Sequence, residues 1–112
     1  MDLQINRDGT FVSADLGGRI DGTNAHEFAQ TVREAIEDTD TCLLIDCKDL
    51  IYISSAGLRA ILMTAKLLQD RKARFALSTL SSQIMEVFQI SGFDKIVAVH
   101  GTREEAVAAL AG

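Results

Sequence analysis

The sequence contains no proline and no tryptophan, and only one of its 112 residues is a tyrosine. So few aromatic rings exclude a surface that stacks nucleic-acid bases, since such a surface needs several exposed aromatic side chains. Basic residues are also in the minority, because 11 lysines and arginines stand against 16 aspartates and glutamates for a formal net charge of −5. This excess opposes binding to nucleic acid or to an anionic membrane face. We therefore expect other proteins as partners.

Long apolar segments are missing as well. No window is long enough for a transmembrane helix, and Met1–Gln4 lacks the basic start of a secretion signal. Cys42 and Cys47 are five residues apart in a predicted strand, which places their thiols on opposite faces and argues against a disulfide between them. Two buried thiols suit a reducing compartment. We expect a cytoplasmic protein with no direct membrane insertion.

What the chain does have is enough apolar sequence for one core. With 47% hydrophobic and 24% charged residues, the composition is that of a globular protein, and the length predicts one domain over residues 1–112. Periodicity predicts strands at 3–5, 11–16, 42–47, 73–77 and 96–99, and helices at 25–36, 58–68, 82–91 and 103–110.

The order of these elements is β-β-α-β-α-β-α-β-α. It predicts an α/β fold with a mixed, mostly parallel sheet of about five strands, in which residues 42–47 are central, and about four helices. Residues 17–22 are expected to form a flexible loop before the first helix. Thr23 or Asn24 is expected to cap that helix, with Glu27 completing a capping box. Thr102 with Glu105 predicts a second capping box.

The most informative segment is 49–58, Asp-Leu-Ile-Tyr-Ile-Ser-Ser-Ala-Gly-Leu. It places Ser54 and Ser55 at the N-terminus of an apolar helix, where unpaired N–H groups and the helix dipole favour a phosphate. A serine there can also be a plain N-cap, and Ser54 can cap while Ser55 lies in the first turn. The segment is a candidate switch.

Helical spacing places Ser55, Arg59, Met63 and Lys66 on one face of this helix. An outward Met63 suits a protein contact, whereas a slightly rotated helix would bury it in the core. Arg59 is one turn from Ser55, where it can contact a phosphate or a partner carboxylate, or remain solvated. Asp21 in its glycine-flanked loop is expected to accept backbone N–H groups.

No catalytic or metal-binding pattern is present in the sequence. His26 and His100 are separated from each other and from the cysteines by spacings that match no metal site. The residues around Ser54 and Ser55 do not form the Gly-x-Ser-x-Gly turn of a hydrolase. We expect a binding protein without cofactor, metal or enzymatic activity.

Three segments together resemble the STAS domain family, and more narrowly the single-domain bacterial anti-sigma-factor antagonists (anti-anti-sigma factors). They are the Gly-Arg-Ile-Asp turn at 18–21, the signature at 49–58 and Phe-Gln-Ile-Ser-Gly-Phe at 88–93. The resemblance covers essentially the whole chain. It implies a partner-switching cycle in which the unphosphorylated protein binds an anti-sigma factor that is also a serine kinase of the GHKL type. Phosphorylation releases that partner, and a PP2C-type phosphatase resets the cycle.

The resemblance maps the phosphoacceptor to Ser55, with Ser54 as the alternative acceptor, and places Asp21 close to it. The partner-binding residues that it implies, together with those on the same helix face, are Asp21, Ser54, Ser55, Ala56, Gly57, Arg59 and Met63. Two positions depart from the family pattern. Ser54 replaces the Asp usual before the acceptor, and Ala56 replaces a second hydroxyl.

Two other functions remain open at this point. One is a STAS-type subunit of a transport or signalling assembly that uses the same surface constitutively, without a phosphorylation switch. The other is a small-molecule sensor, which needs a pocket that the sequence does not reveal.

Overall fold

The computed structural model describes residues 1–111 and confirms the predicted order of strands and helices. A 3-10 turn, η1 (Phe93–Lys95), precedes the last strand. The elements are β1 (Asp2–Asp8), β2 (Phe11–Ile20), α1 (Ala25–Ala35), β3 (Cys42–Ile53), α2 (Ser55–Asp70), β4 (Arg74–Ser78), α3 (Ser82–Ser91), β5 (Ala98–His100) and α4 (Arg103–Ala111).

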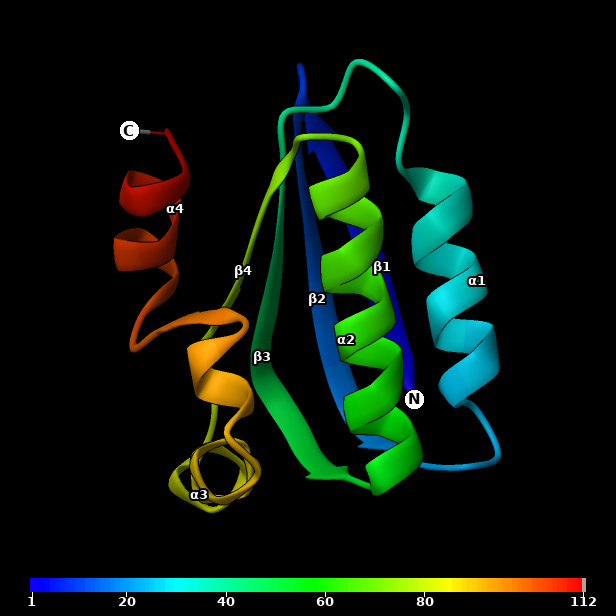
Figure 1. The fold of residues 1–112 in the computed structure, drawn as a ribbon, viewed down its shortest axis with the longest axis vertical. Coiled ribbons are helices and arrows are strands. Elements are labelled where there is room, and N and C mark those ends of the chain that lie inside the picture. The colour runs from blue at the N-terminus through cyan, green and yellow to red at the C-terminus, as the bar shows by residue number, and fades with distance from the viewer. Residues whose placement is uncertain (112) are drawn as a thin grey trace.

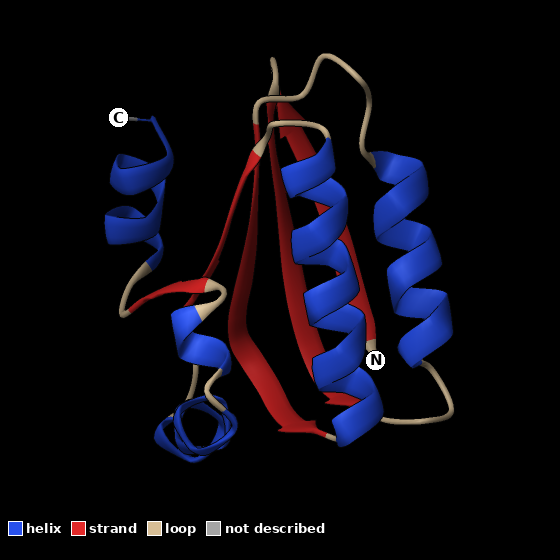
Figure 2. Cartoon of the chain, viewed as in Figure 1, coloured by secondary structure: helices blue, strands red, loops and turns tan. Residues whose placement is uncertain are grey.

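The five strands form one mixed sheet in the order β1-β2-β3-β4-β5 (Figure 2). β1 pairs with β2 in the antiparallel direction, and the other three pairs are parallel. The prediction that the strand beginning at Cys42 is central is confirmed. Its residues Leu43, Leu44 and Ile45 are almost completely buried, as expected for a strand covered on both faces.

The helices form two layers of unequal size. α1 and α2 lie side by side on one face of the sheet, over the larger core, whereas α4 covers part of the other face (Figure 1). The smaller core under α4 contains Cys42, Leu44, Ala76, Ala106 and Leu110. Cys47 belongs to the larger core, so the two cysteines face opposite sides of the sheet as predicted, and both are free thiols.

The predicted loop at 17–22 is wrong for its first four residues, because β2 continues through Ile20. Gly17 pairs with Asp49 and Gly18 with Leu50, so backbone pairing with β3 keeps this glycine segment in the sheet even though Gly18 has a φ of 80°. Shifts in register on both sides of that pairing mark β-bulges. β3 correspondingly continues to Ile53, six residues beyond its predicted end.

The predicted capping box of α1 is also wrong. Asn24 is the N-cap residue, but its side chain makes no capping bond. Its amide oxygen accepts a hydrogen bond from Asp21 N, and its amide nitrogen donates to Arg19 O. At α4, Thr102 Oγ1 accepts from Glu105 N, which is half of the second predicted box.

Among the helices described within residues 1–111, none combines the length and the apolarity needed to cross a membrane.

Candidate functional site at the start of helix α2

The turn from β3 into α2 gives its two serines different surroundings. Ser54 is the N-cap, and its Oγ accepts a hydrogen bond from Gly57 N at 3.2 Å. Ser54 N donates to Ile20 O at 2.9 Å, which ties the turn to the end of β2. Ser55 is the first residue of α2 and is exposed. Of the two arrangements open from the sequence, the structure has Ser54 as the cap and Ser55 in the first turn.

Gly57 allows the first turn of α2 to lie against β2. A Cβ at this position would lie 2.7 Å from Ile53 Cγ1, 2.8 Å from Ile20 Cγ2 and 3.1 Å from Ile20 O. Those separations are shorter than normal carbon contacts, so only glycine fits without displacing its neighbours. Ala56 beside it is half-buried and packs against the larger core. The close approach brings the segment that carries Asp21 next to the serine turn.

Asp21 is held by its own loop, as the sequence predicts. Its Oδ1 accepts hydrogen bonds from Thr23 Oγ1 at 2.5 Å and from Thr23 N at 2.9 Å. These bonds, with a smaller contribution from the charge of Arg19, hold the pKa of Asp21 below its usual range. Asp21 is therefore a fixed negative charge at neutral pH, in the segment that follows Ile20.

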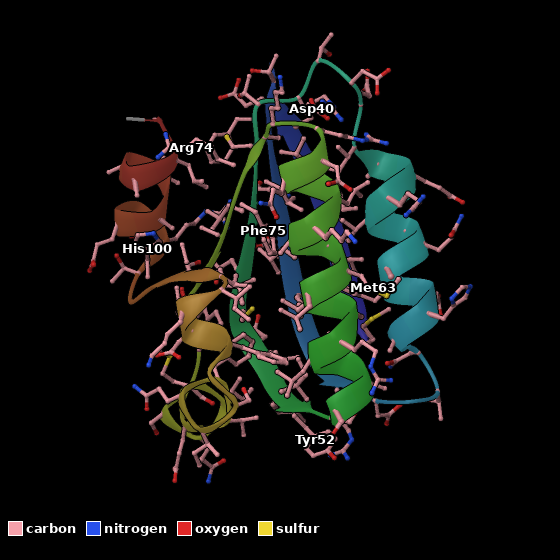
Figure 3. The ribbon with its side chains drawn as sticks, viewed as in Figure 1. Asp40, Tyr52, Met63, Arg74, Phe75 and His100 are labelled. Carbon is pink, nitrogen blue, oxygen red and sulfur yellow. The ribbon has the colours of Figure 1, made fainter. Side chains whose placement is uncertain are left out.

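The outer face of α2 is exposed along its length. Ser55, Arg59 and Lys66 are all open to solvent, and Met63 is 57% exposed. The alternative in which a rotated helix buries Met63 is thus excluded. Met63 lies on the side of α2 toward α1, where it borders a shallow hollow with Ala29 of that helix (Figure 3). An exposed thioether here gives α2 an adaptable apolar contact.

The sequence interpretation missed three residues at the end of β3 and β2. Ile51 is 69% exposed and Tyr52 is 41% exposed. Arg19 pairs with Tyr52 in register, and its guanidinium carbon lies 4.2 Å from the centre of the tyrosine ring, a cation–π contact. These residues are beside the serine turn, and exposed Tyr and Arg side chains are common anchors of protein contacts.

A usable signal for Ile51 was present in the sequence. Leu50, Ile51, Tyr52 and Ile53 are consecutive and large, and a regular strand with one free face cannot bury all four. The register shift between Gly18 and Arg19 adds a residue on β3, and this bulge leaves Ile51 outside the core.

Catalytic or metal chemistry finds no support in the described geometry. Within residues 1–111, no group of three or more His, Cys, Asp or Glu side chains converges in a way that would hold a metal ion. His26 is on α1 and His100 is on β5. The arrangement offers an exposed hydroxyl on a surface with apolar, cationic and anionic groups, which suits recognition of another protein.

Comparison with known proteins assigns the family. A STAS domain model matches residues 2–106, and the chain belongs to the STAS domain family. At 34% identity over 109 residues, the chain is similar to BtrV of Bordetella bronchiseptica, which is named as a candidate anti-sigma factor antagonist. The match covers 97% of this chain and 94% of BtrV.

Solved structures confirm the fold. The chain is similar to an anti-sigma factor antagonist from Mycobacterium paratuberculosis, with a TM-score of 0.88, 19% identity and coverage of 99% of this chain and 94% of that one. It is also similar to the phosphorylated form of the Bacillus cell fate determinant SpoIIAA. There the TM-score is 0.73, the identity 23% and the coverage 96% and 98%.

Proposed function

We propose that this protein is a cytoplasmic, non-enzymatic anti-sigma factor antagonist that binds an anti-sigma factor through the start and outer face of α2. The partner is an anti-sigma factor with serine kinase activity of the GHKL type, and phosphorylation of Ser55 ends the binding. A PP2C-type phosphatase restores the hydroxyl. One observation carries the proposal: Ser55 is exposed on the first turn of α2, while Ser54 caps the helix.

Phosphorylation of Ser55 would add negative charge to the proposed contact surface at the start of α2. The kinase transfers the terminal phosphate of ATP to Ser55 Oγ, the hydroxyl proton goes to a base of the kinase, and ADP leaves. The phosphate carries a charge of about −1.5 to −2. Inside this molecule it is favoured by the N-terminus of α2 and by Arg59, four residues further along the same face.

The disruptive effect of the phosphate must therefore act on the partner. A contact surface that accepted a small neutral hydroxyl would have to accommodate a bulky anion. Asp21, ionised at neutral pH, would lie near a second negative charge on the same side of the turn. Repulsion and the cost of desolvating two anions would both weaken the complex.

The capping bond of Ser54 supports Ser55 rather than Ser54 as the acceptor. Ser54 Oγ already accepts from Gly57 N, so a phosphate on Ser54 would disturb the cap of α2. Ala56 supplies no hydroxyl in this turn. Asp21, Ser54, Ala56, Arg59 and Met63 would then form the contact surface around the acceptor, and Gly57, which is buried, would hold the turn beneath it. Arg19, Ile51 and Tyr52 extend that surface beyond the residues predicted from the sequence.

The proposal is tested by incubating the protein with its cognate kinase and ATP and locating the phosphate by mass spectrometry. We expect modification of the wild type and of Ser54→Ala, and none of Ser55→Ala. Ser55→Asp should weaken binding to the kinase by at least about tenfold, as expected for a buried, unpaired charge. A phosphate found elsewhere, or an unchanged affinity of Ser55→Asp, would contradict the switch. The unchanged affinity would instead indicate constitutive binding.

A further inference from the structure

A groove of about 760 Å³, lined by apolar side chains with polar ones among them, runs along the side of α2 that faces β4 and β5. Leu62 and Ala65 line it from α2, Phe75 from β4, and Ile96 and Val97 from the segment before β5. Figure 3 shows Phe75 between β4 and α2. The groove is separate from the hollow at Met63, which lies on the other side of the same helix.

The groove exists because one crossover helix does not cover its strands. α1 and α2 run alongside the strands, whereas α3, which connects β4 to β5, lies near the strand ends and is seen almost end-on in Figure 1. Parallel strands normally carry their crossover helix on the sheet face. Without it, Phe75 stays half-buried and Ile96 is 64% exposed. The groove is the position that a third covering helix would occupy.

The charges at the groove differ from those of the whole chain. Lys66 and Lys72 line it, and Asp70 is the single acidic residue among its described lining. The protein as a whole has a formal net charge of −5, so this apolar surface has a locally basic border on an acidic molecule. A complementary occupant would carry carboxylates beside an apolar face.

The length of the groove suits a short helix. Leu62 and Gln69, both of which line it, are seven residues apart on α2, or about 10 Å at 1.5 Å per residue. That distance is about two helical turns. A helix satisfies its own backbone hydrogen bonds, so it can lie on the face of the sheet and present side chains one and two turns apart to the groove.

We infer that this groove binds an acidic amphipathic helix of a protein partner. Its apolar side chains pack against Phe75 and Ile96, and its carboxylates lie beside Lys66 and Lys72. Helix α1 of a second copy, which carries Glu27 and Glu34, does not supply such a helix, because its apolar face is already buried against α2 and the sheet. The inference does not depend on phosphorylation of Ser55.

The test uses isotope-labelled protein and two synthetic peptides of about 16 residues, long enough for an isolated helix to form. One peptide has leucines at helical spacing flanked by glutamates, and the other has lysine in place of every glutamate. The glutamate peptide should shift the amide signals of residues 65–73 and 96–97 in NMR spectra. The lysine peptide should bind about tenfold more weakly. Equal binding of the two, no shifts, or shifts confined to other surfaces would overturn the inference.

Variants at exposed positions give an independent check that does not threaten the fold. Ile96→Asp should weaken binding of the glutamate peptide by about tenfold, because the substitution places a charge against the apolar face of the bound helix. The double variant Lys66→Glu, Lys72→Glu should bind the lysine peptide more tightly than the glutamate peptide. Val107→Asp is the matched control, since Val107 is 38% exposed on α4 at the opposite face of the sheet. If Val107→Asp weakens binding as much as Ile96→Asp, the groove is not the site.

Self-association is the remaining outcome. If sedimentation shows that the wild type dimerises and that Ile96→Asp is monomeric, the groove is a contact between copies of this chain. That result would overturn the assignment of a separate acidic partner.

Discussion

Ser54 and Ser55 are neighbours with different surroundings, and alanine substitutions at the two positions should therefore change the free energy of unfolding by different amounts. Ser54→Ala removes the acceptor for Gly57 N and should lower the free energy of unfolding by about 1 kcal/mol. Ser55→Ala removes only an exposed hydroxyl and should change it by less than about 0.5 kcal/mol. Urea denaturation of the two variants gives both values. An equal loss for both would show that Ser55 has a structural role.

Gly57 is constrained by space. Gly57→Ala would place a methyl group within 2.8 Å of side-chain carbons of both Ile53 and Ile20. We expect a loss of about 1–3 kcal/mol, the usual cost of overpacking. Gly22→Ala is the matched control, because a Cβ there meets no atom within 4 Å. Denaturation curves should separate the two variants, and equal curves would mean that the start of α2 shifts without cost.

At the scale of the element, α4 is attached to its face of the sheet by apolar contacts, by a bond from Arg74 Nη1 on β4 to Leu110 O, and by its own Arg103. Arg103 Nη1 lies 3.0 Å from Asp15 Oδ1 on β2 and 3.1 Å from Asp46 Oδ2 on β3. Arg103 Nη2 also donates to Ser13 Oγ at 3.3 Å. The arginine thus connects the first turn of α4 to two strands.

Arg103→Met should loosen α4 without unfolding the sheet. The Arg103 side chain is 39% exposed, so solvent screening limits the expected loss to about 1 kcal/mol. Opening of α4 would uncover Cys42, and labelling of its thiol by a maleimide should become about fivefold faster. Cys47, in the core on the other face, is the internal control and should keep its rate. Faster labelling of both cysteines would indicate global unfolding instead.

The elements also show what sequence patterns can and cannot predict. The order of strands and helices, the opposite faces of the two cysteines and the exposed face of α2 follow from local periodicity. The extension of β2 through Gly17 and Gly18 does not, because glycines usually mark loops, and here pairing with β3, and with β1 at Gly17, keeps the segment in the sheet.

The features of the site that the sequence did not predict also depend on how distant segments pack together. Ile51 is exposed because of a bulge between two strands, and the contact of Arg19 with Tyr52 depends on the register of those strands. The groove beside Phe75 depends on where α3 lies relative to the sheet. Each of these features is decided by residues far apart in the sequence, and only the exposure of Ile51 has a local sign, the run of four large residues at 50–53.

At the scale of the whole molecule, a partly buried ion pair joins the N-terminal hairpin to the α1–β3 connection. Arg7 on β1 donates to both carboxylate oxygens of Asp40, whose side chain is fully buried, and also to Ala35 O at the end of α1. Burial alone would raise the pKa of Asp40. The bonds from Arg7 and Glu37 N and the charge of Arg7 outweigh burial, so the pKa of Asp40 is held below its usual range.

This lowered pKa sets a direction for the pH dependence of stability. Asp40 makes its full contribution to the free energy of unfolding above about pH 4, where its carboxyl would also be ionised in the unfolded chain. That contribution is lost as the pH falls through the lowered pKa of the folded state. Asp40→Asn should be less stable than the wild type at pH 7, and the difference should shrink as the pH falls through that range. The midpoints of urea denaturation of both proteins, measured from pH 7 downward, give this difference in stability. A difference that stays constant with pH would contradict the prediction.

The separate roles of the two adjacent serines affect how the protein can change over generations. The hydroxyl at Ser54 caps α2, whereas the one at Ser55 is exposed. With Ser55 as the proposed phosphoacceptor, a single substitution there would leave a stable domain without that response. On this proposal, regulated and unregulated descendants of such a protein would be one mutation apart.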